Sequence, residues 1–211
     1  MRKKRCLFAA MGMVVGILSF AGGTTAYLSG SAGEVKNVFT AGSVKAQLTE
    51  EHWDIEKASK VYPGQALDKD PVVINTGDNQ ANVFLEVTVP MRNISILNES
   101  TGKKGIRENR ELFTFQADEE KWALLYQEQF NDRKKYIYGY KTALMPGEST
   151  VPLFQKLKAV SYVEGELDVK ENYDVSVAAS VIQVQEGDKN LKEIYQEYLK
   201  QTEADKKEGI E

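Results

Sequence analysis

The sequence predicts an all-β fold, an antiparallel jelly-roll or immunoglobulin-like β-sandwich with a short C-terminal helix. At least seven short runs alternate apolar and polar residues or are rich in β-branched and aromatic residues. Turns with Gly, Pro, Asn or Asp separate these runs, as in antiparallel sheets. Only the C-terminal stretch has its apolar residues at helical spacing. We therefore expect one domain over residues 43–187, followed by an amphipathic helix and charged tail over 188–211.

Three runs in the first half of this domain are expected to be strands: 43–49, 71–75 and 82–90. The first places Val44, Ala46 and Leu48 on one face, which is the period of a half-buried strand. A short polar turn, 76–79, separates the other two runs, so we expect them to pair as a hairpin.

Two features are expected to limit the strand that reaches residue 90. Pro90 has no backbone N–H to donate, so it should end the strand or lie on a sheet edge. The following stretch, 92–111, is polar and contains Gly102 and Gly105. We therefore expect a surface loop there.

Aromatic alternation indicates a second hairpin, formed by residues 121–126 and 135–140. Tyr136, Tyr138 and Tyr140 fall on one face, and Asn131 and Asp132 supply the turn. A helix over 118–130 is the competing interpretation, because Glu, Lys, Ala and Leu favour helices. The aromatic content and the matching partner run favour the hairpin.

The last predicted strand, 172–185, is followed by helical signals. Its inward positions are Tyr173, Val175, Val177, Ala179 and Val181. Asn190 and Glu193 then have the spacing of a capping box. An apolar stripe follows on one helical face: Leu191, Ile194, Tyr195, Tyr198 and Leu199. We expect a helix that fades after Thr202 and packs on the sandwich, with docking to a partner as the alternative.

The N-terminus has the pattern of a secretory signal peptide. A basic start, Met1 to Arg5, precedes an apolar run from Cys6 to Ala21 and small residues up to Ala26. The apolar run is shorter than the roughly 20 residues of a membrane-spanning helix, although a permanent anchor is the alternative. We expect a signal peptide over 1–27, with cleavage around Ala26, Tyr27 and Leu28. The protein is then extracellular, with no membrane contact after processing.

Composition excludes most catalytic chemistry. The chain has 27 basic against 31 acidic residues, one His and one Cys, which disfavours nucleic acid as a partner. Cys6 lies in the predicted signal peptide, and His52 alone cannot supply a protease zinc site or a typical triad. Two acidic clusters, Asp68/Asp70 and 118–120, could serve a glycosidase or a calcium site. Acidic clusters in loops are usually solvated surface residues, and we expect that here. We expect no enzyme, no cofactor and no bound metal.

Several segments together resemble one family. The exit 22–28 of the signal peptide is similar to signals cut by the specialised signal peptidase SipW of Gram-positive bacteria. The segment 38–44 (VFTAGSV) resembles the F-x-A-G-[ST] opening of the mature TasA and camelysin family. The run from Tyr62-Pro63-Gly64 through Asp70-Pro71 to Asn75-Thr76-Gly77 is similar to that family's next motif. Within 92–170, Trp122, the run 138–140 and the run 146–150 look like the shorter clostridial-type members, and 172–185 again resembles the family.

The resemblance implies a secreted structural subunit of extracellular biofilm matrix fibres. In the family's fibre formers a freed N-terminal segment becomes a strand of the next subunit. Here that donor segment would be 28–42, with Val35, Val38 and Phe39 as its apolar side chains. The implied partners are other copies of the chain, head to tail, and the signal peptidase during export.

Two other functions stay open at this stage. Camelysin-like members have been described as surface metalloproteases, which here would depend on His52. A monomeric adhesin or carbohydrate-binding module could instead use Trp122 and the three tyrosines as a stacking platform. Burial of these rings would assign them to the core, whereas exposure would favour the platform.

Overall fold

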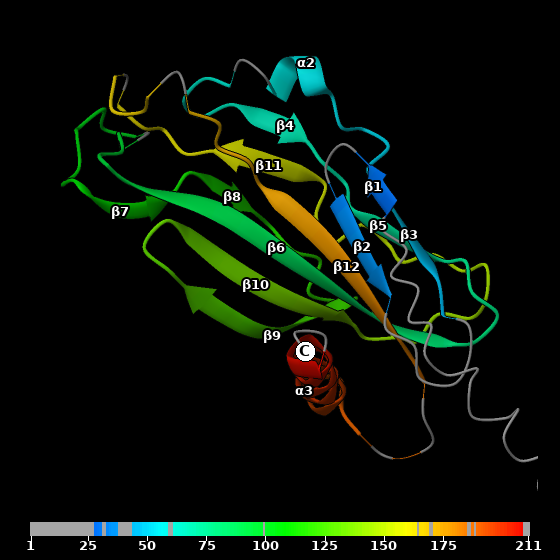
Figure 1. Ribbon diagram of the computed structural model, residues 1–211. Helices are drawn as coiled ribbons and strands as arrows, with labels where there is room; N and C mark the ends of the chain where they lie inside the picture. The colour runs from blue at the N-terminus through cyan, green and yellow to red at the C-terminus, as the bar shows by residue number, and fades with distance from the viewer. Residues whose placement is uncertain are drawn as a thin grey trace, which may run out of the picture.

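The predicted all-β, sandwich-like fold with a C-terminal helix is confirmed (Figure 1). The computed structural model describes residues 28–30, 33–37, 44–58, 61–98, 100–163, 165–168, 171–184, 187 and 189–208. The predicted signal peptide, 1–27, lies outside these residues. One large curved sheet faces a second layer made of two smaller sheets.

The large sheet has the order β1-β2-β12-β6-β10-β9, with β7 paired to the far end of β6. Its strands are β1 (Leu28–Gly30), β2 (Gly33–Asn37), β6 (Ala81–Ile94), β7 (Glu108–Glu111), β9 (Trp122–Gln129), β10 (Arg133–Tyr140) and β12 (Ser176–Gln183). The facing layer consists of β4 (Ala66–Asp68), β11 (Lys156–Ala159) and β8 (Phe113–Phe115), and of β3 (Ala46–Thr49) paired with β5 (Val72–Asn75). A single-turn helix, α2 (Ile55–Ala58), lies between β3 and β4 in the chain.

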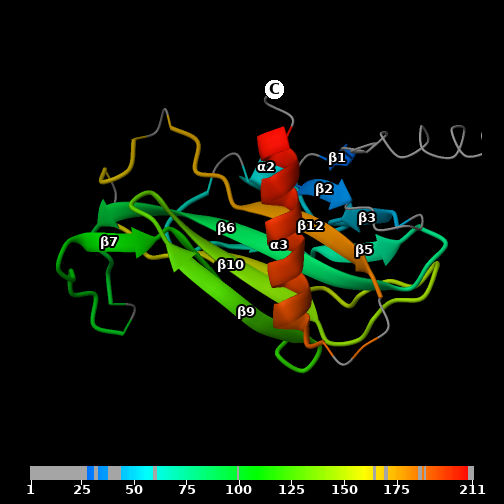
Figure 2. The same cartoon turned by 60° about the horizontal axis from the view of Figure 1, so that its bottom comes forward.

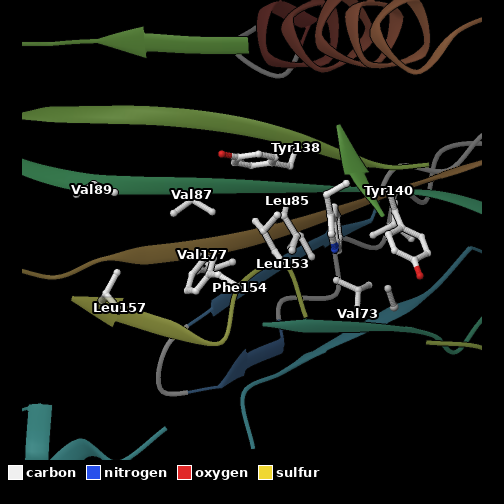
Figure 3. Packing of buried hydrophobic residues seen from close by; sticks show 14 of the residues in the cluster. Val73, Leu85, Val87, Val89, Tyr138, Tyr140, Leu153, Phe154, Leu157 and Val177 are labelled. Carbon is white, nitrogen blue, oxygen red and sulfur yellow. The ribbon is translucent and has the colours of Figure 1, made fainter. Parts of the chain in front are cut away.

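The main core lies between the two layers (Figure 3). Strand β6 contributes Leu85, Val87 and Val89, each 0% exposed. Leu153 and Phe154, which precede β11, enter from the opposite layer and are 0% and 2% exposed. At about 25 cal/mol per Å² of apolar surface removed from water, such side chains supply the main driving force for the fold.

A second apolar cluster covers the outer face of the large sheet. The helix α3 (Leu191–Glu208) lies across this face (Figure 2). Its Tyr195 and Tyr198 are 5% and 6% exposed and pack with Phe84, Ile137 and Ile182 of the sheet. Strand β6 is therefore buried on both faces where the helix covers it. The helix packs on the domain, as predicted.

The predicted capping box at the start of α3 is confirmed. The Glu193 N–H donates to Asn190 Oδ1, and the Asn190 N–H donates to Glu193 Oε2, both at 3.0 Å. The prediction that the helix fades after Thr202 is wrong, because α3 continues to Glu208. Charged residues dominate that last part, and they are good helix formers.

One predicted hairpin is confirmed and the other is wrong. Strands β9 and β10 pair as antiparallel neighbours, which excludes the helix over 118–130. Strands β5 and β6 do not pair with each other: β5 pairs with β3, and β6 pairs with β10 and β12. The turn between them crosses from one layer of the sandwich to the other.

The expected strand end at Pro90 is also wrong, because β6 continues to Ile94. Pairing of β6 with β12 ends at Thr88, and pairing with β7 begins at Met91. The Met91 N–H points to the other side and donates to the Asp132 carbonyl at 2.7 Å. Pro90 therefore lies between the part of β6 that pairs with β12 and the part that pairs with β7. At this position the missing backbone N–H of proline removes no hydrogen bond between strands. The expected loop 92–111 contains the end of β6 and all of β7.

Candidate assembly edge

The N-terminal segment supplies the outer strands at one side of the large sheet. Strand β2 pairs in parallel with β12, with Gly33 opposite Val177, Val35 opposite Ala179 and Asn37 opposite Val181. Strand β1 folds back on β2 as an antiparallel neighbour. Without residues 28–37, β12 would be the edge of this sheet and would leave one row of backbone groups unpaired.

Strand β12 is buried on its core face, partly covered on its outer face and paired on one edge. Val177, Ala179 and Val181 point into the core and are at most 1% exposed. On the outer face, the Ser180 hydroxyl lies 3.2 Å from the Tyr198 hydroxyl of α3. The third side pairs with β6 along the full length of β12. The remaining side of β12 is the one that β2 occupies.

The connectivity of β2 is unlike that of the other strands beside it. A parallel pair cannot be joined by a tight turn, and nearly the whole domain lies between β2 and β12 in the sequence. On its C-terminal side β2 leads to β3 through residues 38–43, which lie outside the described residues. The described segment 28–37 thus precedes the whole sandwich, and no other element has to be threaded past it.

The predicted processing and donor residues fall partly on this edge. Leu28 is the first residue of β1 and is the register partner of Val35 in β2. Val35 lies at the centre of the parallel pairing. Ala26 and Tyr27 of the predicted cleavage site lie outside the described residues. Val38 and Phe39 of the predicted donor segment lie outside them as well.

The aromatic platform for sugars is not formed. Trp122, Tyr138 and Tyr140 are 1%, 7% and 8% exposed and belong to the main core. Figure 3 shows the two tyrosines there. Burial of these rings identifies them as core residues, by the criterion stated above. Tyr136 is half-buried, and its hydroxyl donates to the Glu111 carboxylate at 2.8 Å. It lines a cavity of about 530 Å³ together with Phe115 and Tyr138.

The acidic candidates have structural partners. Asp118 accepts hydrogen bonds from the Glu120 and Lys121 N–H groups and so stabilises the turn before β9. Asp68 pairs with Lys156 across β4 and β11 at 2.9 Å. Asp70 differs from the solvated surface residue expected, because it is 9% exposed. Within the described ranges, no group of three or more His, Cys, Asp or Glu side chains could hold a metal ion.

His52 lies on the surface and is tied to Asp70. Its backbone N–H donates to Asp70 Oδ1 at 3.0 Å, and its ring Nδ1 lies 2.7 Å from Asp70 Oδ2. The side chain of His52 is 72% exposed. The hydrogen bond to the Asp70 carboxylate and its negative charge raise the pKa of His52 above its ordinary value.

This pair predicts a small dependence of stability on pH. Because the pKa of His52 is raised in the folded state, its contribution is complete below about pH 6.5, the unfolded value. The contribution is lost as the pH rises through the folded-state pKa. We expect the urea midpoint to fall as the pH rises above about 6.5, and to fall less in His52→Gln. An equal fall in both proteins would contradict this contact.

Sequence reasoning missed one feature of this region, a buried ion pair. Nζ of Lys69 lies 2.7 Å from Oε2 of Glu50, and their side chains are 1% and 7% exposed. Lys69 stands between Asp68 and Asp70, so by composition it belongs to a solvated charge run. No local pattern in the sequence marks its burial, which involves Glu50 and Trp53 earlier in the chain and the backbone at Gln155.

No family model, no curated protein and no solved structure matches this chain. Among the residues that the structure describes, no helix is long and apolar enough to cross a membrane. The resemblance to the TasA and camelysin family thus stays a prediction from the residues that carry it.

Proposed function

We propose that the chain is a secreted structural subunit of extracellular matrix fibres, which assembles by exchange of its N-terminal strand. One observation carries this proposal: residues 33–37 fill the side of β12 that faces away from β6. In a fibre, the same position is filled by residues 33–37 of the preceding subunit. Each subunit then donates one strand and accepts another, and the number of backbone pairings per subunit is unchanged.

Physical chemistry favours such an exchange at this edge. An unpaired strand edge is a template for another chain, and an added strand satisfies its backbone groups. The donor and acceptor surfaces differ, so the contact is head to tail. A head-to-tail contact that does not close into a ring propagates as a filament. Removal of the predicted signal peptide would free the donor segment at its N-terminal side.

Paired cysteines distinguish exchange from pairing within one subunit. Glu34 and Ala178 are register partners in β2 and β12, and neighbouring strands are close enough for a disulfide. The only native cysteine, Cys6, lies in the predicted signal peptide. We expect an oxidised mixture of Glu34→Cys and Ala178→Cys subunits, assembled together, to form disulfide-linked dimers on non-reducing gels.

The matched control pairs Glu34→Cys with Leu124→Cys. Leu124 is exposed and lies on β9, at the opposite side of the same sheet, so this mixture should give no specific dimer. The double variant Glu34→Cys/Ala178→Cys should give long linked chains after assembly. If it gives only internally linked monomers, and the mixture gives no dimers, the strand pairs within its own subunit and the exchange proposal is wrong.

A further inference from the structure

Glu50 and Lys69 form a buried contact between the two small sheets of the facing layer. Glu50 follows β3 directly, and Lys69 follows β4 directly. These strands belong to different sheets. The Lys69 N–H donates to the Gln155 carbonyl at 3.1 Å, which fixes the backbone from which the side chain starts. Nζ of Lys69 and Oε2 of Glu50 lie 2.7 Å apart, with the Lys69 backbone fixed by this hydrogen bond.

An aromatic ring and an unpaired oxygen mark the surroundings of this pair. The Trp53 ring lies over the Lys69 ammonium, with its centroid 4.3 Å from Nζ. Oε1 of Glu50 is buried without a hydrogen-bond partner among the described residues. A buried charge with an unsatisfied oxygen is costly unless it is neutralised. Moving one proton along the existing 2.7 Å contact converts the ion pair into a neutral amine beside a neutral carboxylic acid.

Burial acts on both groups in the direction of that neutral pair. Desolvation lowers the pKa of the Lys69 ammonium and raises the pKa of the Glu50 carboxyl, against the mutual attraction of the two charges. A second carboxylate, Asp70, follows Lys69 in the sequence, and its charge acts on both side chains. Asp70 is itself held by His52.

We propose that Lys69 and Glu50 condense into an intramolecular amide that joins Nζ of Lys69 to Cδ of Glu50. The nitrogen lone pair attacks Cδ of the protonated carboxyl and forms a tetrahedral intermediate. The bond from Cδ to the hydroxyl oxygen then breaks, and the hydroxyl takes a proton from the nitrogen and leaves as water. One amide bond and one water molecule form, and no atom is oxidised or reduced.

Such a bond would fix β3 to β4 in a chain whose only cysteine lies in its predicted signal peptide. Closing the loop from residue 50 to residue 69 restricts the unfolded chain, as a disulfide does. It would also remove the two buried charges and use the carboxyl group that now has an unsatisfied oxygen. This inference does not depend on strand exchange, because both residues belong to one subunit.

The mass of the purified exported protein tests the proposal directly. After its N-terminus is determined, the denatured protein should weigh less than its sequence requires by one water molecule. Proteolysis should release one branched peptide that contains both residue 50 and residue 69. The full sequence mass would overturn the proposal, and so would a lost water that maps to any other residues.

Lys69→Arg is the matched control. Arginine keeps the positive charge and the donors toward Glu50, but its guanidinium stays protonated and is not a nucleophile. This variant should have its full mass and separate peptides for residues 50 and 69. If it also lost one water molecule, Lys69 would not be the reacting amine. The result for the unmodified chain decides the matter even where the variant fails to fold.

Discussion

A mature chain that lacks residues 28–40 is expected to form no filaments, whereas the chain that begins at Leu28 does. The deletion removes β1 and β2 and leaves the β12 edge without a strand to fill it. The domain should keep its β-rich circular dichroism, since β12 remains paired with β6 from Ser176 to Gln183. Electron microscopy of the two proteins at equal concentration provides the measurement.

A peptide of residues 28–40 should bind the deleted chain and restore its sheet edge. The intact chain already has this position filled, so it should bind the peptide far more weakly. Burying a side chain such as Phe39 contributes roughly 1.5–3 kcal/mol. At about 1.4 kcal/mol per tenfold, a Phe39→Asp peptide should bind about ten- to a hundredfold more weakly.

Two outcomes would contradict strand exchange. Filaments formed by the deleted chain would show that assembly uses another surface. A deleted chain that is unfolded, and that the peptide does not restore, would show that the segment is an integral strand of its own domain. Phe39→Asp in the full mature chain distinguishes strand exchange from pairing within one subunit. Exchange predicts that filaments are lost while the monomer stays folded. Pairing within the subunit predicts that the monomer becomes less stable.

The sequence predicts strands well where one side of a strand faces water. The β9–β10 hairpin could be recognised because aromatic or large apolar residues recur at every second position in both runs, with an Asn-Asp turn between them. The wrong hairpin at residues 71–90 has the same local appearance. Two apolar strands that flank a short turn look alike whether they pair in one sheet or face each other across a core. Only the facing layer decides this, and it is built by residues such as Leu153 and Phe154.

Polar strands lack the alternation of apolar residues from which a strand is predicted. Strand β7 has the sequence ENRE and none of its residues is fully buried, so composition alone describes it as a loop. The same limit applies to the Glu50–Lys69 pair. The two residues are ordinary charged residues in their local sequence, and their burial depends on Trp53 and on the packing of β11. The N-terminal strand could be anticipated only as a segment, since its partner β12 lies at the far end of the domain.

Replacing Phe84 with Ala is expected to lower the free energy of unfolding by about 3–5 kcal/mol, the usual cost for a buried aromatic residue. Phe84 is 1% exposed and lies between the large sheet and α3. Its ring centroid is 5.2 Å from that of Tyr195. Opposite it in β10, Gly139 has no side chain, so Leu191 of the helix and Leu125 of β9 approach closely. A cavity at this point would therefore loosen the start of the helix.

The control for this prediction lies on the same helix. Leu199 is 40% exposed, so Leu199→Ala should change the stability by less than about 0.5 kcal/mol. Urea unfolding followed by circular dichroism gives both values, and hydrogen exchange along α3 shows where the loss occurs. In Phe84→Ala, amides of α3 should exchange faster than those of β6, because the helix is held to the sheet mainly through this cluster. Equal small effects of the two substitutions would mean that α3 is not packed on Phe84, and its apolar face would then be free for another molecule.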